Sequence, residues 1–424
     1  MSGNTAKTGA RRRIDQTELD AICARHDRLW QAKPGGARAV LAWLDLSGLS
    51  LKGRNLADAD FAAASLIGTD LSGAKLDNAT FFGADMQDCL LIDASLRRTD
   101  LRGACLRGAD LSGADLFEAD LREGTIAAAD AKLGFRIVEA KSRKDTEAQG
   151  ACLVGANLER SKLTGIVAVA ADFTDAIMKD CKMVRANLKQ ASFRGADMSG
   201  ADLSGADLSG ADLRDAVLVG AKVVMWRTDG ANMAGTLTDD RSSGSPVCKL
   251  PAAEMLSEHA RWCESGGAAG RPSVFDGVDL RALGSIQGYD LTALSARGAV
   301  FYGLDMGGVQ LQGAHLENAD LRSVNLKGAD LRGARLAGAR LNGSDLRGAR
   351  LGPLMISDDR LLPADLTGAC LRGADLSGAD FQRAVMAGAD LSRAVMFGAC
   401  LRLADLTDAV TTGARGLEAP DARP

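Results

Sequence analysis

Aromatic residues are scarce in this chain of 424 residues, where Phe, Tyr and Trp together make up 4%. A globular core of that size normally uses more of them, because aromatic side chains carry much of the buried area of a core. Apolar residues nevertheless make up 46% of the chain. They must therefore be buried in an arrangement other than a broad globular core.

Long apolar runs and a strong net charge are also missing. No segment of about 18 consecutive apolar residues occurs, which excludes a transmembrane helix. A formal charge of −4 is small for this length, so the overall field favours neither nucleic acid nor a membrane surface. The basic cluster Arg11–Arg13 precedes polar residues, so we expect no secretory signal. The nine cysteines form no C-x-x-C pair, and we expect free thiols in a reducing cytoplasm.

What the chain has instead is a repeat of five residues. Every fifth residue is apolar from Leu46 to Ile126, from Leu153 to Met233 and from Ile286 to Leu406, with a few weak members. Residues 199–213 read SGADLSGADLSGADL. A period of five fits neither an α-helix nor a β-strand. It is typical of a chain that turns a corner every five residues, in parallel coils about 4.8 Å apart that satisfy each other's backbone.

The rare bulky residues at the repeat centres indicate that one coil holds twenty residues. Two pairs of Phe are 20 residues apart, a third pair is 80 apart, and Met follows five residues later in five of the six cases. Multiples of twenty predict that Phe stacks over Phe on one face and Met over Met on the next, because a mismatched neighbour would leave a void. The predicted structural core includes Phe61, Phe81, Met86, Phe173, Met178, Phe193, Met198, Phe301, Met306, Phe381 and Met386.

With units of the form A-(D/N)-L-x-x over residues 45–126, 153–235 and 284–408, the chain resembles the pentapeptide-repeat family. The resemblance implies an all-β solenoid, a right-handed four-sided parallel β-helix with about 20 residues per coil, and a bacterial source. Members of this family are mostly uncharacterised, so the resemblance says more about fold than about function.

Two segments outside the repeats have the pattern of short amphipathic helices, at residues 15–31 and 251–265. Each precedes a run of repeats by a similar interval, so we interpret the chain as a tandem duplication of one helix-capped solenoid. His26 and His259 share a position in the two helices. They are either parts of a site or, more simply, cap residues that form local hydrogen bonds.

The predicted organisation follows from these boundaries. An insertion at 127–152 interrupts the first solenoid, because the next clean centre after Ile126 breaks the period of five. The last run has a defect at Pro353 and Pro363, where proline cannot donate to a central ladder. The segments are a disordered basic N-terminus at 1–14, a capping helix and lead-in at 15–42, a first solenoid at 43–235, a linker at 236–249, a second capping helix and lead-in at 250–279, a second solenoid at 280–411 and a flexible tail at 412–424.

No catalytic set, cofactor site or metal site is predicted, since a bore filled by Leu and Ala leaves no substrate pocket. The insertion is either a solvated loop or a loop that contacts a partner, because scaffolds often carry specificity on loops. The family resemblance adds that an insertion loop matters for activity in members that act on topoisomerases. The candidate partner-binding residues are Phe135, Arg136, Lys141, Arg143 and Lys144.

Two functions are compatible with the sequence. The first is a non-enzymatic protein-binding scaffold that presents flat faces to a partner protein. The second, implied by the resemblance, is a DNA mimic that acts on DNA gyrase or topoisomerase IV, in quinolone resistance or self-immunity. Such mimicry needs uniform negative charge. Residues 43–126 hold 8 basic and 14 acidic side chains, whereas residues 153–235 hold 10 of each and residues 277–415 hold 15 of each.

We therefore favour the scaffold. Its partner would be an unidentified protein in the cytoplasm, with a topoisomerase as the alternative and without direct contact to nucleic acid or membrane. The C-terminal coil has no predicted helix over it, and a bare β edge invites pairing, so a homodimer through that coil is also expected.

Overall fold

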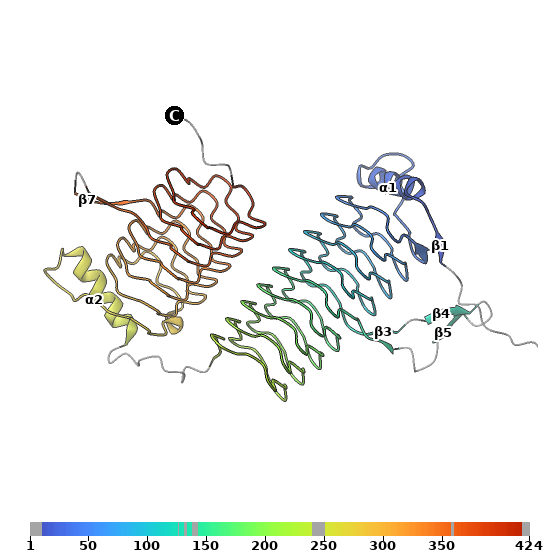
Figure 1. Ribbon diagram of the computed structural model, residues 1–424, viewed down its shortest axis with the longest axis horizontal. Helices are drawn as coiled ribbons and strands as arrows, with labels where there is room; N and C mark the ends of the chain where they lie inside the picture. The colour runs from blue at the N-terminus through green and yellow to red at the C-terminus, as the bar shows by residue number, and fades with distance from the viewer. Residues whose placement is uncertain are drawn as a thin grey trace, which may run out of the picture. The chain divides into compact units, whose positions relative to one another are not determined.

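The computed structural model describes residues 11–125, 127–130, 134–137, 143–239, 251–357 and 360–417. The chain divides into two compact units, Met1–Asp239 and Asp240–Pro424. Among the described residues, each unit consists mainly of stacked turns of chain and contains one short α-helix, labelled α1 or α2 (Figure 1). In the part of the chain that is described, no helix is both long enough and apolar enough to cross a membrane.

Regular strands are short because each coil is joined to the next by single bridge residues. The first unit contains β1 (Arg12–Arg13), α1 (Gln16–Trp30), β2 (Leu44–Asp45), β3 (Gly124–Thr125), β4 (Ala127–Asp130), β5 (Gly134–Ile137) and β6 (Arg143–Lys144). The second unit contains α2 (Ala252–Glu264), the 3₁₀ helix η1 (Arg281–Leu283), β7 (Leu354–Ser357) and β8 (Arg360–Leu362).

Parallel bridges between residues twenty positions apart hold the coils together. Asp45 pairs with Ser65, Ser65 with Asp85, and Asp85 with Cys105. Next to each bridge, the centre residue donates its N–H to the following coil, as Leu46 does to the carbonyl of Ser65 at 2.8 Å. Every fifth residue forms such a bridge, so a coil of twenty residues has four bridge positions. The coil length inferred from the Phe spacing is therefore the one that the structure adopts.

Hydrogen bonds around each corner explain the sequence Ala-Asp-Leu-Ser-Gly. The backbone N–H of Ser199 donates to Oδ1 of Asp197 at 3.1 Å, and Ser199 Oγ donates to the same oxygen at 2.7 Å. Gly200 follows with a φ of 67°, in the left-handed region that glycine enters without a steric penalty. The N–H of Ala201 then donates to the carbonyl of Met198 at 3.1 Å and completes the turn. The aspartate thus has a structural role, because its carboxylate accepts the hydrogen bonds that stabilise the turn.

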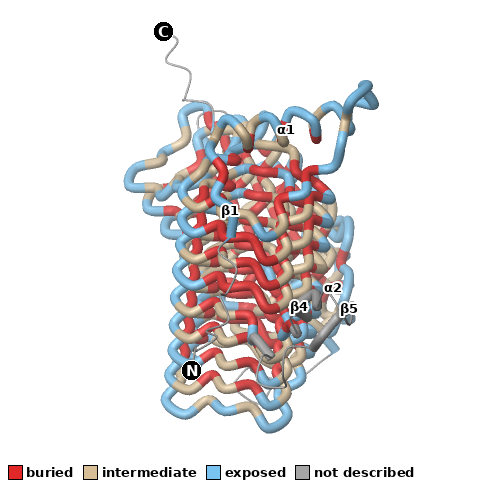
Figure 2. The backbone as a smooth tube through the Cα atoms, turned by 90° about the vertical axis from the view of Figure 1, so that its right-hand side faces the viewer, coloured by how far each residue is buried: buried red, intermediate tan, exposed pale blue. Residues whose placement is uncertain are grey.

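Centre residues and the Ala two positions before them fill the bore of each solenoid. Figure 2 shows that buried positions recur from coil to coil. All eleven side chains of the predicted core are buried. The rings of Phe61 and Phe81 lie 4.6 Å apart at 5°, and those of Phe173 and Phe193 lie 4.9 Å apart at 1°. These distances match the rise of about 4.8 Å between parallel coils, so stacked rings leave no void.

Phe301 and Phe381 do not share a face, although their spacing of 80 residues predicts that they do. Phe381 follows Leu351 in its column, because the N–H of Leu351 donates to the carbonyl of Asp380 at 2.6 Å. The column of Phe301 instead continues to Leu371, through bridges from Asp320 to Arg340 and from Arg340 to Cys370. An insertion between the two Phe residues shifts one column against the other by half a coil.

That insertion is a hairpin in the second unit which the repeat pattern conceals. Arg335 pairs with Asp365, so this coil contains ten residues more than the usual twenty. Strands β7 and β8 pair antiparallel within it. Ile356 and Leu361, which the apolar period counts as core centres, are 53% and 45% exposed. Ten residues equal two repeats, so the period of five passes through the hairpin unchanged.

The insertion in the first unit lies earlier than the predicted range 127–152. Leu121 is the last buried centre before it, and Ala148 occupies the first centre after it, with its N–H donating to the carbonyl of Val167 at 2.7 Å. The apolar period misses this coil because Ala replaces Leu at its centre. Within the insertion, β3 pairs antiparallel with β6, and β4 with β5. Ile126, the predicted end of the first run, lies outside the described residues.

Ordered chain extends beyond several predicted boundaries. β1 pairs in parallel with β2, so residues 12–13 are ordered although the sequence places them in a disordered N-terminus. Val274 pairs with Ser295, and Arg415 with Val395, so the second solenoid begins before residue 280 and continues past residue 411. Most of the predicted linker and the end of the predicted tail lie outside the described residues.

Candidate functional site

The five residues predicted to contact a partner all fall within the first insertion. Phe135 and Arg136 lie in β5, which pairs with β4. Arg143 and Lys144 lie in β6, which pairs with β3, and Lys141 lies outside the described residues. The backbone thus distributes the four described residues over two different strand pairs. Their role in binding stays a prediction.

The β7–β8 hairpin exposes large apolar side chains, of which Ile356 and Leu361 had been assigned to the core by the repeat pattern. Met355, Ile356 and Leu361 are 66%, 53% and 45% exposed. Met355 and Leu361 are direct cross-strand partners, so their side chains lie on the same face of the hairpin. The sequence does contain one signal for this element, because Pro353 and Pro363 flank it and neither can donate to a ladder.

The base of this hairpin lies against a row of glycines on the solenoid. A Cβ on Gly333 would lie 2.8 Å from Cβ of Leu354 and 3.2 Å from Cδ2 of Leu362. A Cβ on Gly313, in the preceding coil, would lie 3.8 Å from Cδ2 of Leu354. A side chain at position 333 would therefore displace the hairpin, and its absence allows Leu354 and Leu362 to fix the hairpin on the scaffold.

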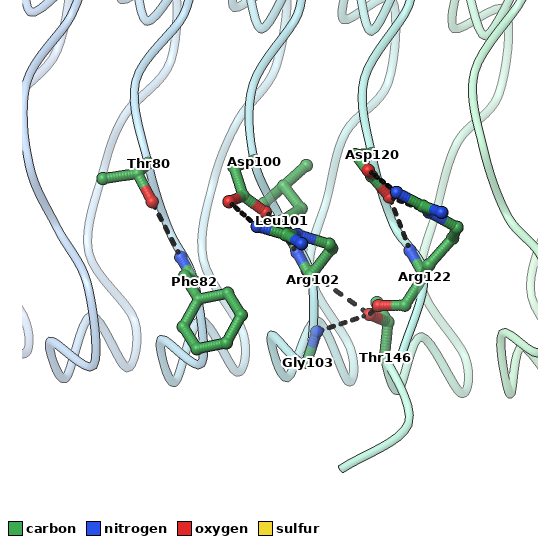
Figure 3. A network of polar contacts seen from close by, with 9 residues as sticks. All are labelled: Thr80, Phe82, Asp100, Leu101, Arg102, Gly103, Asp120, Arg122 and Thr146. Carbon is green, nitrogen blue, oxygen red and sulfur yellow. Dashed lines mark hydrogen bonds and ion pairs between the residues drawn. The ribbon is translucent and has the colours of Figure 1, made fainter. Parts of the chain in front are cut away.

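Arginine and aspartate alternate on one face of the first solenoid near the insertion. Arg102 Nη2 lies 2.8 Å from Asp100 Oδ2, and Arg122 Nη2 lies 2.7 Å from Asp120 Oδ2. Figure 3 shows the two pairs on neighbouring coils, with Phe82 beside them. The guanidinium carbon of Arg102 lies 5.3 Å from the centroid of the Phe82 ring. Asp100 and Asp120 thus each have a cation at the same corner, so the negative charge of this face is interrupted at these two coils.

Thr146 joins the end of the insertion to this same face. Its Oγ1 accepts the N–H of Gly103 at 2.9 Å and lies 2.9 Å from the carbonyl of Arg122 and 3.3 Å from that of Leu101 (Figure 3). Thr146 is fully buried. It therefore satisfies backbone groups of two coils at the point where the chain returns to the solenoid.

Corner carboxylates stay ionised because turn donors stabilise their charged form. The side-chain hydroxyl of Ser204 lowers the pKa of Asp202, and the backbone N–H of Ser204 lowers it further against an opposing effect of burial. The pKa of Asp207 is lowered in the same way by Ser209. The carboxylates that give these faces negative charge are thus the same groups that accept the hydrogen bonds of the turns.

His26 joins α1 to the first coil of its solenoid. The residue is fully buried, and its Nδ1 accepts the N–H of Ala39 at 3.0 Å. A further hydrogen bond links the ring to the backbone of Ala57, and Trp30 Nε1 lies 3.2 Å from Nε2. Burial lowers the pKa of this imidazole, so it is neutral at neutral pH.

His259 has the equivalent place in the second unit. Its Nδ1 accepts the N–H of Ser273 at 2.9 Å, and its Nε2 lies 3.1 Å from the carbonyl oxygen of Thr292. Burial lowers its pKa as well. Both histidines therefore form local hydrogen bonds that join each capping helix to its own solenoid, in line with the simpler interpretation of their shared position.

Other chemistry-bearing groups are used in packing. In the described ranges, no group of three or more His, Cys, Asp or Glu side chains is placed to hold a metal ion. Burial raises the pKa of Cys89 to about 12 and that of Cys23 to about 11, so both thiols stay protonated. A hollow of about 290 Å³ beside α1 is lined by His26, Trp30 and Arg38, among other residues.

Comparison with known protein families identifies the repeats of this chain. The family model for pentapeptide repeats matches residues 45–83, 84–122, 151–190, 181–220, 314–352, 364–398 and 374–413, which together make up more than half of the chain. No curated protein matches the chain.

Several solved structures resemble it at low TM-scores. A pentapeptide repeat protein (Rfr23) from the cyanobacterium Cyanothece 51142 is 25% identical, with 33% of this chain and 91% of that chain covered and a TM-score of 0.25. HetL, a pentapeptide repeat protein involved in heterocyst differentiation regulation from Nostoc sp. strain PCC 7120, is 23% identical, with 93% and 96% covered and a TM-score of 0.14. A trypsin-treated QnrB1, a plasmid-mediated fluoroquinolone resistance protein, is 17% identical, with 54% and 99% covered and a TM-score of 0.22.

At these TM-scores the structural likeness adds no argument to the family match. The family model matches the repeats in the sequence. The structure agrees with this match, because each regular coil holds twenty residues and has a bridge at every fifth residue. Pentapeptide-repeat proteins are right-handed four-sided β-helices. The chain belongs to the pentapeptide-repeat family.

Proposed function

We propose that this protein is a non-enzymatic scaffold that binds a partner protein. Each unit would be a right-handed four-sided β-helix whose filled bore keeps its faces rigid, and the insertions would supply the contacts. The observation that carries this proposal is the β7–β8 hairpin, where Met355 and Leu361 are exposed on one face of an element fixed over Gly333. Apolar groups held in solvent on a rigid support are typical of surfaces that bind other proteins.

The test uses the tagged full-length chain as bait in a lysate of its native host, with mass spectrometry of the captured proteins. The variant Met355→Ser/Leu361→Ser removes the apolar pair, and Ile67→Ser is the matched control because Ile67 is 41% exposed on the first solenoid. We expect the wild type and the control to capture the same partner and the double variant to recover about tenfold less, the loss expected for about 1.4 kcal/mol of binding energy. Equal recovery by all three contradicts the role of the hairpin.

The first insertion is the second contact that we propose, through Phe135, Arg136, Lys141, Arg143 and Lys144. Charge reversal of the basic residues, with Phe135 unchanged, separates an electrostatic contribution from an apolar one. We expect it to weaken capture of the same partner more strongly at low salt than at high salt. Capture that is unchanged at low salt removes these residues from the proposed contact.

A second candidate function is modulation of DNA gyrase or topoisomerase IV by imitation of duplex DNA. It is favoured by the 14 acidic against 8 basic residues in 43–126 and by carboxylates that stay ionised. Hydrogen bonds from Ser72 lower the pKa of Asp70 in this way. The Arg–Asp pairs at Arg102 and Arg122 weaken the case, because they interrupt the negative charge. A gyrase supercoiling assay with and without ciprofloxacin tests it, and no effect at micromolar protein rejects it.

A homodimer through the last coil of the second unit is part of the same proposal. Phe397 and Leu403 are 59% and 62% exposed there. Light scattering after size exclusion should give twice the mass of the chain, and Leu403→Asp should return it to the monomer mass because charge opposes apolar pairing. A monomer for the wild type at high concentration contradicts this mode of assembly.

A further inference from the structure

Each capping helix is held on its solenoid by very few buried side chains. Helix α1 buries Leu19, Cys23 and His26, and helix α2 buries Leu256 and His259. In each helix the histidine ring links three segments: the helix itself, the lead-in that follows it and the first coil of the solenoid. With so few contacts, the charge state of a single imidazole has a large effect on docking.

The geometry around His259 accommodates only a neutral ring. Nδ1 accepts a hydrogen bond from the N–H of Ser273, so the ring proton lies on Nε2, which donates to the carbonyl of Thr292. A second proton on Nδ1 would face the Ser273 N–H, with the two donor nitrogens 2.9 Å apart. Protonation therefore breaks one hydrogen bond and places a charge at a fully buried position.

Groups around His259 do not compensate for that charge. Asp290 on the first coil favours the protonated ring, but burial outweighs its effect, so the pKa stays below 6.5. Cys263 on α2 lies with Sγ 3.6 Å from the carbonyl of Thr292, and burial raises its pKa to about 11, so it is neutral. On the outer part of α2, Arg261 pairs with Glu258 at 3.0 Å.

Helix α1 has further ties to its solenoid that do not depend on its histidine. Gln16 Nε2 donates to the carbonyl of Ser50, and the N–H of Ser50 donates to Gln16 Oε1, both at 2.9 Å. Arg54 Nη2 lies 2.8 Å from Asp20 Oδ1. Among the described ion pairs, none links α2 to its first coil in this way.

The surroundings of His26 are also more mixed than those of His259. Asp27 and Asp58 favour the protonated ring, whereas Arg38 and, most strongly, burial oppose it. Protonation of His26 and of His259 therefore acts on two capping helices that differ in the number of other contacts to their solenoids.

We propose that acidification uncaps the second unit: protonation of His259 releases α2 from the first coil, while α1 stays docked through Gln16 and Asp20. Neutral His259 stabilises the docked state above the ordinary histidine pKa of 6.5, and this contribution is lost as the pH falls through the lower pKa of the docked ring. Release of α2 opens the edge of the first coil to solvent, and such edges are sites of pairing.

Hydrogen–deuterium exchange of the full chain at pH 7.5 and pH 5.0, corrected for the intrinsic pH dependence of exchange, tests the proposal. We expect exchange within α2 to rise about tenfold at pH 5.0 and exchange within α1 to change far less. His315→Gln is the matched control, because His315 contacts Arg297 and Glu317 of the solenoid, and it should behave as the wild type. In His259→Gln the pH dependence of α2 should disappear.

A second measurement covers the case in which His259→Gln undocks α2 at both pH values. The chain has three histidines, so their titrations can be resolved by NMR in the wild type. The midpoint for His259 should coincide with the midpoint of α2 exchange. Unchanged protection of α2 at pH 5.0, protonation of His259 without release, or equal release of α1 and α2 would each overturn the proposal.

Discussion

A corner aspartate in this chain accepts two hydrogen bonds within its own repeat before any partner is present. The pair formed by Asp207 and Ser209 is typical, with backbone N–H and hydroxyl distances of 3.1 and 2.5 Å. Since a turn donor stabilises the carboxylate, its charge contributes to folding. An acidic surface in such a protein is therefore first a consequence of turn chemistry.

Acid should destabilise the solenoid in a pH range distinct from that of the caps. Hydrogen bonds from the residue two positions later lower the pKa values of Asp202, Asp207 and Asp212 below 3.8. Their stabilising contribution is present above the unfolded pKa and is lost as the pH falls through the lower folded values. We expect urea unfolding followed by circular dichroism to give a decline in stability below about pH 4 that is separate from the effect of the caps between pH 7 and 5. The triple Asp→Asn variant should show a weaker decline, and an identical decline contradicts this account.

The stacked phenylalanines should be the costliest single positions. Phe81 is fully buried on Phe61, whereas its neighbour Phe82 lies at the surface beside Arg102. We expect Phe81→Ala to lower the free energy of unfolding by about 3–5 kcal/mol, because a cavity in a narrow bore cannot collapse. Phe82→Ala removes only a cation–π contact and should cost about 1 kcal/mol or less. Similar losses for the two variants in urea unfolding would show that the bore does not carry the stability.

At the scale of elements, insertions and caps differ in how they are fixed to the coils. The β7–β8 hairpin is fixed by close packing over glycine, since Cβ of Leu354 would meet a Cβ on Gly333 at 2.8 Å. The caps are fixed by a few hydrogen bonds around a buried imidazole. Packing does not respond to protons and the imidazole does, which is why we expect pH to act on a cap and not on the hairpin.

Replacement of one glycine should loosen the hairpin selectively. Gly333→Ala places a methyl group against Leu354 and Leu362, whereas Gly303 has a similar φ of 69° and open space within 4 Å of the point where a Cβ would lie. Both changes should cost about 1–2 kcal/mol for the left-handed backbone. Only Gly333→Ala should also raise the exchange and proteolysis rates of residues 354–362. Equal rates in the two variants would mean that Gly333 does not hold the hairpin.

At the scale of the whole molecule, the chain has two cores that share no residue. One cluster of buried residues extends from Ile14 to Leu218, and the other from Leu256 to Leu401. In a solenoid each coil stabilises only its neighbours, so a break between cores is also a break in cooperativity. The two units are therefore expected to unfold as separate transitions.

Calorimetry of matched core variants tests that expectation. Phe81→Ala in the first unit and Leu371→Ala in the second both remove fully buried side chains. Each should lower the melting temperature of one transition by several degrees and leave the other in place, because about 3 kcal/mol is a large fraction of the stability of one unit. A single transition that both variants shift together contradicts independent unfolding.

Sequence alone determined the repeat, the length of the coil and the approximate position of both capping helices. These features depend on local rules: a centre residue must be apolar, a corner needs Asp and Gly, and bulky rings must stack at one coil's distance. The spacing of Phe61 and Phe81 in the sequence equals one coil, and their rings stack on adjacent coils in the structure. The five candidate contact residues came from the break in the repeat, and four of them lie in short strands whose side chains are not described.

Only the tertiary structure located the β7–β8 hairpin and separated the columns of Phe301 and Phe381. The first insertion is visible in the sequence because its length is not a multiple of five and the phase changes. The second is ten residues long, so Ile356 and Leu361 stay in phase and imitate core centres while they lie in solvent. The period of five gives the position of a residue within its repeat. Burial of that residue depends on which coil packs above it, and the packing of the coils is decided only in the tertiary structure.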